Sequence, residues 1–225
     1  MRKIIIKSAL VTLAVVVGCA VLVFAVLSLG FPRILCGWCE QLGNYGFAVR
    51  YASLYYSYTG DIADLGRCVD DSILAESDGF IIEYASELVD KAEFGEYCEL
   101  RDEEVNGSIS DDENFDGISF SYRQYVFGSL ASAYYRGGDD ELAIGTAVSA
   151  LDADVDRNTF SSSEYSGEIT GFPVNNALGS LALRVIENGD GTAGEKILGI
   201  LDDVTAQSDA EVLYLATLAN ALMEL

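Results

Sequence analysis

The sequence predicts an all-α protein, in which short antiparallel helix pairs are stacked behind an N-terminal membrane anchor. Three observations predict this class. Apolar residues recur at intervals of three and four along most of the chain, and glycines interrupt these runs where helices would end. No segment keeps the two-residue alternation of a strand. An uncharged apolar run, residues 8–30, precedes the body.

The apolar run predicts a transmembrane signal anchor. Its 23 residues are enough for one membrane-spanning helix, whereas the apolar region of a secretory signal is usually shorter. Arg2, Lys3 and Lys7 precede the run and no acidic residue does. Residues 1–7 are therefore expected in the cytoplasm and residues 31–225 on the extracytoplasmic side of the cell membrane. Two alternatives remain open: lipidation at Cys19, in a segment similar to a bacterial lipobox, and cleavage near Gly30.

The clearest helix pair is predicted in residues 127–151. One apolar stripe runs along its first helix at offsets 0, +3, +4 and +7, through Phe127, Leu130, Ala131 and Tyr134. Gly137 and Gly138 end this helix, since a helix C-terminus often needs a residue that tolerates positive φ. Asp139 then caps the second helix, whose own stripe comprises Ala143, Ala147, Ala150 and Leu151.

The same offsets recur from three other origins. They select the sets Pro32, Leu35, Cys36, Cys39; Leu178, Leu181, Ala182, Val185; and, in a looser copy, Ile81, Tyr84, Ala85, Leu88. A turn glycine follows at +11 in the other three copies, at Gly43, Gly138 and Gly189. This pattern resembles the tetratricopeptide repeat family, through the segments LCGWCEQLGNYGFAVRYASLYY, LASAYYRGGDDELAIGTAVSAL and LALRVIENGDGTAGEKILGIL. The resemblance implies a TPR-like stack of helical hairpins, an α-solenoid, over residues 31–225.

The chain departs from that family in its spacing. The family repeats at about 34 residues, whereas these turn glycines are 95 and 51 residues apart, and the closing proline is missing. We therefore expect loop insertions near 102–118 and 152–173. The other predicted elements are three helices in 31–75 with turns at 43–44 and 59–61, a helix over 79–101, a loop over 102–116, a helix from about 119, a hairpin over 174–206, and a final helix over 210–225 opened by a capping box at 208–211.

Composition excludes several classes of function. The chain has 13 basic and 36 acidic residues, and three of the basic ones precede the anchor, so the body has ten basic and 36 acidic residues and a net charge of −26. Such a surface repels nucleic acid and anionic lipid headgroups, and it favours cations or a basic protein partner. Histidine is absent, and Lys91 and Lys196 are the only lysines after residue 7. Without these bases and nucleophiles, we expect no enzyme.

Four cysteines of the body form a candidate redox or metal site. Cys36 and Cys39 form a CxxC motif, but a thioredoxin-like redox site needs a preceding strand, and here a membrane helix precedes it. Both cysteines lie on the apolar stripe, which favours buried structural thiols. A redox role, a zinc site formed with Cys68 and Cys98, and a disulfide involving Cys68 remain open alternatives.

Two acidic loops and one aromatic face are the other candidate sites. Asp112, Asn114 and Asp116 match the start of a calcium loop, and Asp152, Asp154 and Asp156 repeat the spacing. Both loops lack parts of the motif, so solvated acidic loops are the preferred interpretation, and no other cofactor is expected. Tyr51, Tyr55 and Tyr58 share one helical face, which either packs between helices or lines a partner groove.

Together these features predict a membrane-anchored extracytoplasmic protein–protein interaction or scaffold module. One alternative is a calcium- or ligand-responsive extracytoplasmic sensor, and another is a membrane-tethered thiol oxidoreductase. The partner and the oligomeric state are not specified by the sequence.

Overall fold

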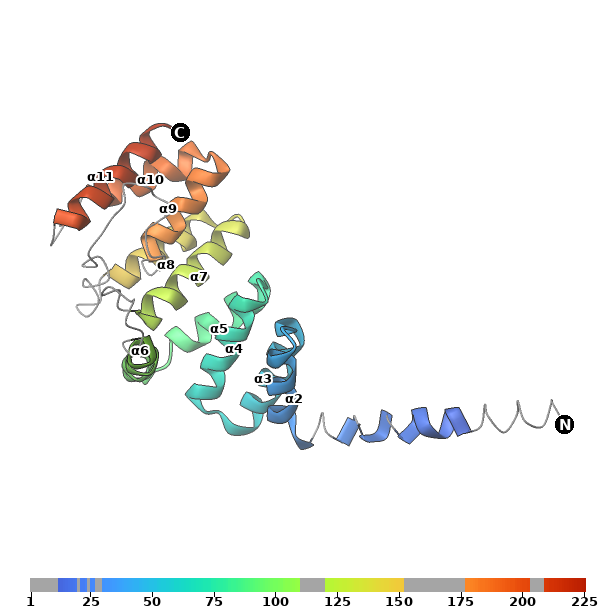
Figure 1. The fold of residues 1–225 in the computed structure, drawn as a ribbon. Coiled ribbons are helices and arrows are strands. Elements are labelled where there is room, and N and C mark those ends of the chain that lie inside the picture. Colours follow the sequence, from blue (N-terminus) through green and yellow to red (C-terminus); the bar gives the residue numbers. More distant parts are fainter. Residues whose placement is uncertain are drawn as a thin grey trace, which may run out of the picture. The chain divides into compact units, whose positions relative to one another are not determined.

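The computed structural model describes residues 12–19, 21–23, 25–26, 30–109, 120–151, 177–202 and 209–225, and these are helical with short turns and no strand. The all-α prediction is therefore confirmed for the part of the chain described. From residue 32 onward the helices are α2 (Pro32–Gln41), α3 (Tyr45–Thr59), α4 (Ile62–Leu74), α5 (Asp78–Val89), α6 (Phe94–Ile109), α7 (Tyr122–Arg136), α8 (Asp140–Leu151), α9 (Ala177–Asn188), α10 (Gly191–Leu201) and α11 (Asp209–Met223) (Figure 1).

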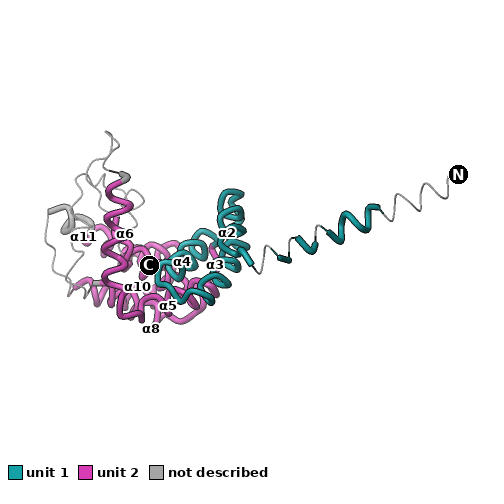
Figure 2. The backbone as a smooth tube through the Cα atoms, turned by 90° about the horizontal axis from the view of Figure 1, so that it is seen from below, with its two compact units in different colours: residues 1–75 teal, residues 76–225 magenta. Residues whose placement is uncertain are grey.

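The chain forms two compact units, Met1–Ala75 and Glu76–Leu225 (Figure 2). In the first, the described residues of the apolar run are helical and exposed, and the large apolar side chains among them are each more than half exposed: Leu13, Val15, Val16, Val17, Val21, Leu22, Val23 and Val26. Among the residues described, we find no single helix that combines the length and the apolar character needed to span a membrane.

Helices α2, α3 and α4 make up the body of the first unit. All three predicted helices are confirmed, and so are the turns between them: Gly43 and Gly60 have φ of +68° and +64°. Asp61 caps α4, where its side chain accepts a hydrogen bond from the Ala63 N–H at 2.8 Å. The core of this unit is small, and its buried apolar residues are Leu35, Cys36, Ala48, Val49, Ala52, Leu65, Cys68 and Val69.

The second unit contains consecutive antiparallel helix pairs. Helices α7 and α8 pack together as predicted, and α9 contacts both of them as well as α10 and α11 (Figure 1). The turn glycines Gly138 and Gly189 have φ of +82° and +65°, which explains why glycine is needed there. The predicted stripes of α5, α7 and α9 face the core: their residues are all buried except Tyr134, which is half-buried.

The predicted single helix over 79–101 is wrong, because the chain breaks between α5 and α6. A turn follows Val89, in which the Lys91 N–H bonds the Leu88 carbonyl at 3.1 Å. Continuing the α5 period would have turned Ala92 and Glu96 inward. The break shifts the phase, so that Phe94, Tyr97 and Cys98 are buried in α6.

The loop predicted over 102–116 is also wrong in its first half, because α6 continues to Ile109. Two polar side chains of α6 explain why this acidic stretch is ordered. Asp102 accepts the N–H of Tyr122 at 2.6 Å, and the Asn106 amide bonds both the N–H and the carbonyl of Phe120, at 2.7 and 3.0 Å. The rest of this insertion, residues 110–118, lies outside the described residues.

A buried glutamine forms hydrogen bonds with the helices on both sides of the second insertion. The Gln124 side chain donates to the Ala150 carbonyl at 3.0 Å, near the end of α8, and accepts the Ala177 N–H at 2.9 Å, at the start of α9. Residues 152–173 themselves lie outside the described residues, as do the capping-box residue Ser208, the expected helix start at residue 119 and both ends of the hairpin expected over 174–206.

Candidate functional site

Helix α2 has two dissimilar faces. Its inner face buries Pro32, Leu35 and Cys36. Its outer face is also apolar, although it is exposed: the exposed fractions are 53% for Phe31, 47% for Ile34, 53% for Trp38 and 83% for Leu42. We call these four residues the outer face of α2. An apolar stripe on each side of one short helix is unusual for a solvated surface helix, which normally has one polar face.

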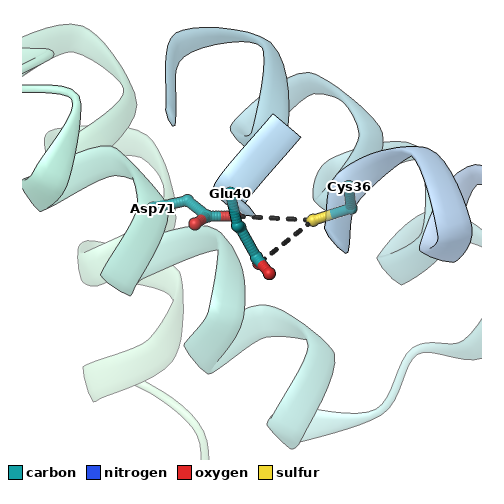
Figure 3. A group of neighbouring side chains, drawn as sticks. All are labelled: Cys36, Glu40 and Asp71. Atoms are coloured by element: carbon teal, nitrogen blue, oxygen red, sulfur yellow. Dashed lines mark hydrogen bonds between the residues drawn. The ribbon is translucent and has the colours of Figure 1, made fainter. Parts of the chain in front are cut away.

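A cluster of polar side chains lies on the inner side of α2, where this helix meets α4. The Cys36 Sγ is 3.4 Å from the Glu40 Oε1 and 3.5 Å from the Asp71 Oδ2 (Figure 3). Cys36 and Glu40 are one helical turn apart, which brings both side chains to the same face of α2. The thiol has a single proton, so it donates to one carboxyl group at a time.

Arg67 of α4 completes the cluster. Its Nε and Nη2 donate to the two oxygens of Glu40 at 2.6 and 2.7 Å, a two-pronged ion pair between α2 and α4. Gly37 faces the guanidinium, and a Cβ there would make an ordinary van der Waals contact with the Nη2, at 3.7 Å. Such fork geometry is specific to arginine and a carboxylate. The ion pair therefore fixes the rotation of α2 against α4.

These environments shift the pKa of each titratable group. Burial, reinforced by the negative charge of Glu40, raises the pKa of Asp71 to about 7. The hydrogen bonds from Arg67 hold the pKa of Glu40 below its usual value. Burial also raises the pKa of the Cys36 thiol far above its usual value, an effect that the nearby Arg67 only partly opposes. Near neutral pH the cluster thus holds a thiol, a carboxylate, a guanidinium and a carboxyl group that is about half protonated.

The donor atoms of the cluster form a candidate metal site. The Cys36 Sγ and one oxygen each of Glu40 and Asp71 lie within 4.8 Å of one another, and a thiolate with two carboxylates is a set that a divalent transition metal accepts. However, Arg67 already engages both oxygens of Glu40 and places a positive charge beside the three donors. The arrangement therefore suits a shared proton and a guanidinium better than a metal ion.

The cysteines are placed largely as the stripe predicted. Cys36, Cys68 and Cys98 are buried, Cys39 is half-buried, and all five cysteines of the chain are free thiols. Cys36 lies mid-helix in α2, away from the helix N-terminus that would stabilise a thiolate. Burial raises the pKa of Cys39 as well. These surroundings favour a structural role for both thiols over the redox alternative.

The tyrosines of the predicted aromatic face lie on α3. Tyr51 and Tyr55 are half-buried, and Tyr58 is 59% exposed. The guanidinium carbon of Arg33 lies 5.6 Å from the centre of the Tyr55 ring, so this ring is near the start of α2. The calcium candidates Asp112, Asn114, Asp116, Asp152, Asp154 and Asp156 all lie outside the described residues.

The sequence reasoning missed Glu40, Arg67 and Asp71. A signal for two of them exists in the pattern. Glu40 lies four residues after Cys36 and extends the buried stripe of α2, and Asp71 lies three residues after Cys68 on α4. An acidic residue in a buried stripe indicates a partnered charge, because an isolated buried charge is too costly. Arg67 carries no such signal.

Helix α2 thus joins a polar cluster on its inner side to an exposed apolar face on its outer side. The chain was compared with known protein families, curated proteins and solved structures, and none of them matched it.

Proposed function

We propose that the protein is a membrane-anchored, extracytoplasmic interaction module whose TPR-like helical body holds a basic segment of another protein. The observation that carries this proposal is that α5, α7 and α9 bury the same offsets and pack in succession, α5 on α7 and α7 on α9. Stacked hairpins of this kind present an extended surface to a partner, which is the common use of helical repeats.

The acidic charge of the body supports a basic partner. On α6, Glu96, Glu99 and Glu103 are exposed on one face around Leu100, which is itself 60% exposed. Three carboxylates around an apolar side chain match a segment with basic residues and one apolar anchor. We call these four residues the α6 face.

Photo-cross-linking tests this proposal. The full-length chain, with a photoreactive amino acid in place of Leu100, is irradiated in intact membranes. A matched chain carries the same group in place of Leu142 of α8, which is 51% exposed. We expect one protein to be cross-linked repeatedly from position 100 and not from position 142, and the product to be lost when Glu96, Glu99 and Glu103 are replaced by glutamine. No product from either position would overturn the binding function, and a product insensitive to the glutamines would overturn its electrostatic basis.

The anchor is supported by the 23 uncharged residues 8–30 and by the exposed apolar side chains along their described part. We expect the full-length chain to stay with membranes after alkaline carbonate extraction. A chain in which Val16 and Leu22 are replaced by arginine should be released, because a charge near the bilayer centre opposes insertion. Release of the unaltered chain would contradict the anchor.

A further inference from the structure

The outer face of α2 is held in place by buried and paired side chains of the same helix. Ile34, Trp38 and Leu42 follow intervals of four, so on a helix they fall within an arc of about 80°, and Phe31 stands just before the first turn. The inner face cannot rotate outward to exchange with it, because Leu35 and Cys36 are buried and Glu40 is fixed by Arg67. The outer face of α2 is therefore fixed on the surface of the first unit.

The chain leaves the helical conformation at Phe31, the first residue of this face. Phe31 has φ −139° and ψ 51°, outside the helical region, and Pro32 occupies the start of α2. Proline has no N–H to donate and disfavours a helical residue before it. The apolar run of residues 8–30 thus ends one residue before the outer face begins, and a helix through it does not continue straight into α2.

The charge of this part of the chain differs from that of the rest. Residues 31–60 contain Arg33, Arg50 and a single acidic residue, Glu40, which is paired with Arg67; the other 35 acidic residues of the chain all follow residue 60. The same 30 residues contain eight aromatic side chains, including the only tryptophan of the chain. Tryptophan and tyrosine concentrate where a membrane meets water, and basic residues favour lipid phosphates.

The two arginines are exposed beside aromatic rings. The guanidinium carbon of Arg33 lies 5.6 Å from the centre of the Tyr55 ring, and that of Arg50 lies 5.6 Å from the centre of the Phe47 ring, with Phe47 itself 51% exposed. A ring that enters the headgroup layer beside a guanidinium combines apolar burial with a contact to phosphate.

We propose that the outer face of α2 lies in the interfacial layer of the lipid bilayer, with Trp38 and Ile34 at the boundary between headgroups and acyl chains. The α2–α3 hairpin is then a membrane-facing part of the protein. This inference rests on the anchor of the proposed function and adds a second membrane contact to it.

Because Trp38 is the only tryptophan, its fluorescence reports on this face alone. The full-length chain is reconstituted in phosphatidylcholine vesicles, with and without lipids brominated near the headgroup end of the acyl chain, and flotation first establishes that it is membrane-bound. We expect the brominated lipids to quench Trp38 at least twofold, and the vesicles to protect it from aqueous acrylamide. Trp38 that is open to acrylamide and not quenched by brominated lipid, in chains that float, would overturn the inference and leave the anchor intact.

Matched variants separate the face from the anchor. Replacing Ile34 and Leu42 by serine should reduce the quenching at least twofold while flotation is unchanged. Replacing Leu74 by serine, an apolar residue of α4 that is 53% exposed and lies off this face, should not reduce it. Protection from acrylamide without quenching by brominated lipid would mean that a second copy covers the face, and would also overturn the inference. A chain that fails to float contradicts the anchor and this inference together.

Discussion

Asp71 is a carboxyl group placed where water scarcely reaches it, with an exposed fraction of 3%. Its pKa is raised to about 7 from 3.8, so between these values the folded chain keeps a proton that the unfolded chain has lost. Folding stability therefore falls as the pH rises through this window. Glu40 acts in the opposite direction, because its pKa is lowered: its contribution is present above pH 4.5 and is lost at lower pH.

Replacing Asp71 by asparagine should remove the loss of folding stability that occurs as the pH rises. We compare the free energy of unfolding of the variant with that of the unaltered chain at two pH values. The advantage of the variant should be about 2 kcal/mol larger at pH 7.5 than at pH 5, given about 1.4 kcal/mol per pKa unit. Urea unfolding measures this difference, followed by the fluorescence of Trp38, which lies in the same compact unit as Asp71. Asp64→Asn, at a half-buried position in the first turn of α4, is the control. An equal pH dependence in the Asp71 variant and the unaltered chain would refute the assignment.

The Cys36 thiol should be inert in the folded chain, because it is buried and its pKa is raised by that burial. We expect N-ethylmaleimide at neutral pH to modify α2 in the variant Cys36→Ser, through the half-buried Cys39, and hardly at all in Cys39→Ser. Both variants should be modified equally in urea. Peptide mass spectrometry measures the extent, and fast modification of Cys36 in the folded chain would revive the oxidoreductase hypothesis.

At the scale of elements, two helical glycines of the second unit have different surroundings. A Cβ on Gly128 of α7 would lie 3.3 Å from the Ala177 Cα and 3.4 Å from the Ser180 Oγ of α9, whereas a Cβ on Gly145 of α8 would meet nothing within 4 Å. Gly128 is thus a packing requirement of the α7–α9 contact, and Gly145 is only a weak point in its helix.

These glycines predict opposite responses to the same substitution. Gly145→Ala should stabilise the chain by about 1 kcal/mol through helix propensity, and Gly128→Ala should offset that gain by crowding the backbone of α9 at a cost of about 1–3 kcal/mol. Urea unfolding followed by circular dichroism measures the difference, which should be about 2 kcal/mol in favour of Gly145→Ala. If Gly128→Ala proves as stable as Gly145→Ala, the close approach of α7 and α9 is not real.

At the scale of the whole molecule, the net charge of −23 opposes folding through repulsion among carboxylates. Raising NaCl from about 20 to about 300 mM shortens the range of that repulsion, so we expect the melting temperature of the full-length chain in neutral detergent to rise by several degrees. CaCl2 and MgCl2 at equal ionic strength should act alike. A further rise with CaCl2 alone would favour the calcium-responsive alternative, and no rise with NaCl would contradict the repulsion.

Much of the fold was predictable because its signals are local. The stripes that begin at Pro32, Ile81, Phe127 and Leu178 depend only on the helical period, and positive φ at Gly43, Gly138 and Gly189 follows from the geometry of helix ends. The break after Val89 was missed because alanine and lysine there suit a helix, and only the burial of Phe94 and Tyr97 against distant residues shifts the phase.

The sequence by itself determined that the chain is helical, where four of its apolar stripes lie, that all but one of its acidic residues follow residue 60, and that its cysteines sit among apolar residues. Only the tertiary structure decided that Cys36 and Glu40 meet Arg67 and Asp71, residues 27 to 35 positions away, and that one apolar face of α2 stays uncovered. The helical period can be read from neighbouring residues, whereas the pairing of side chains and the exposure of a helix face depend on which helices pack together.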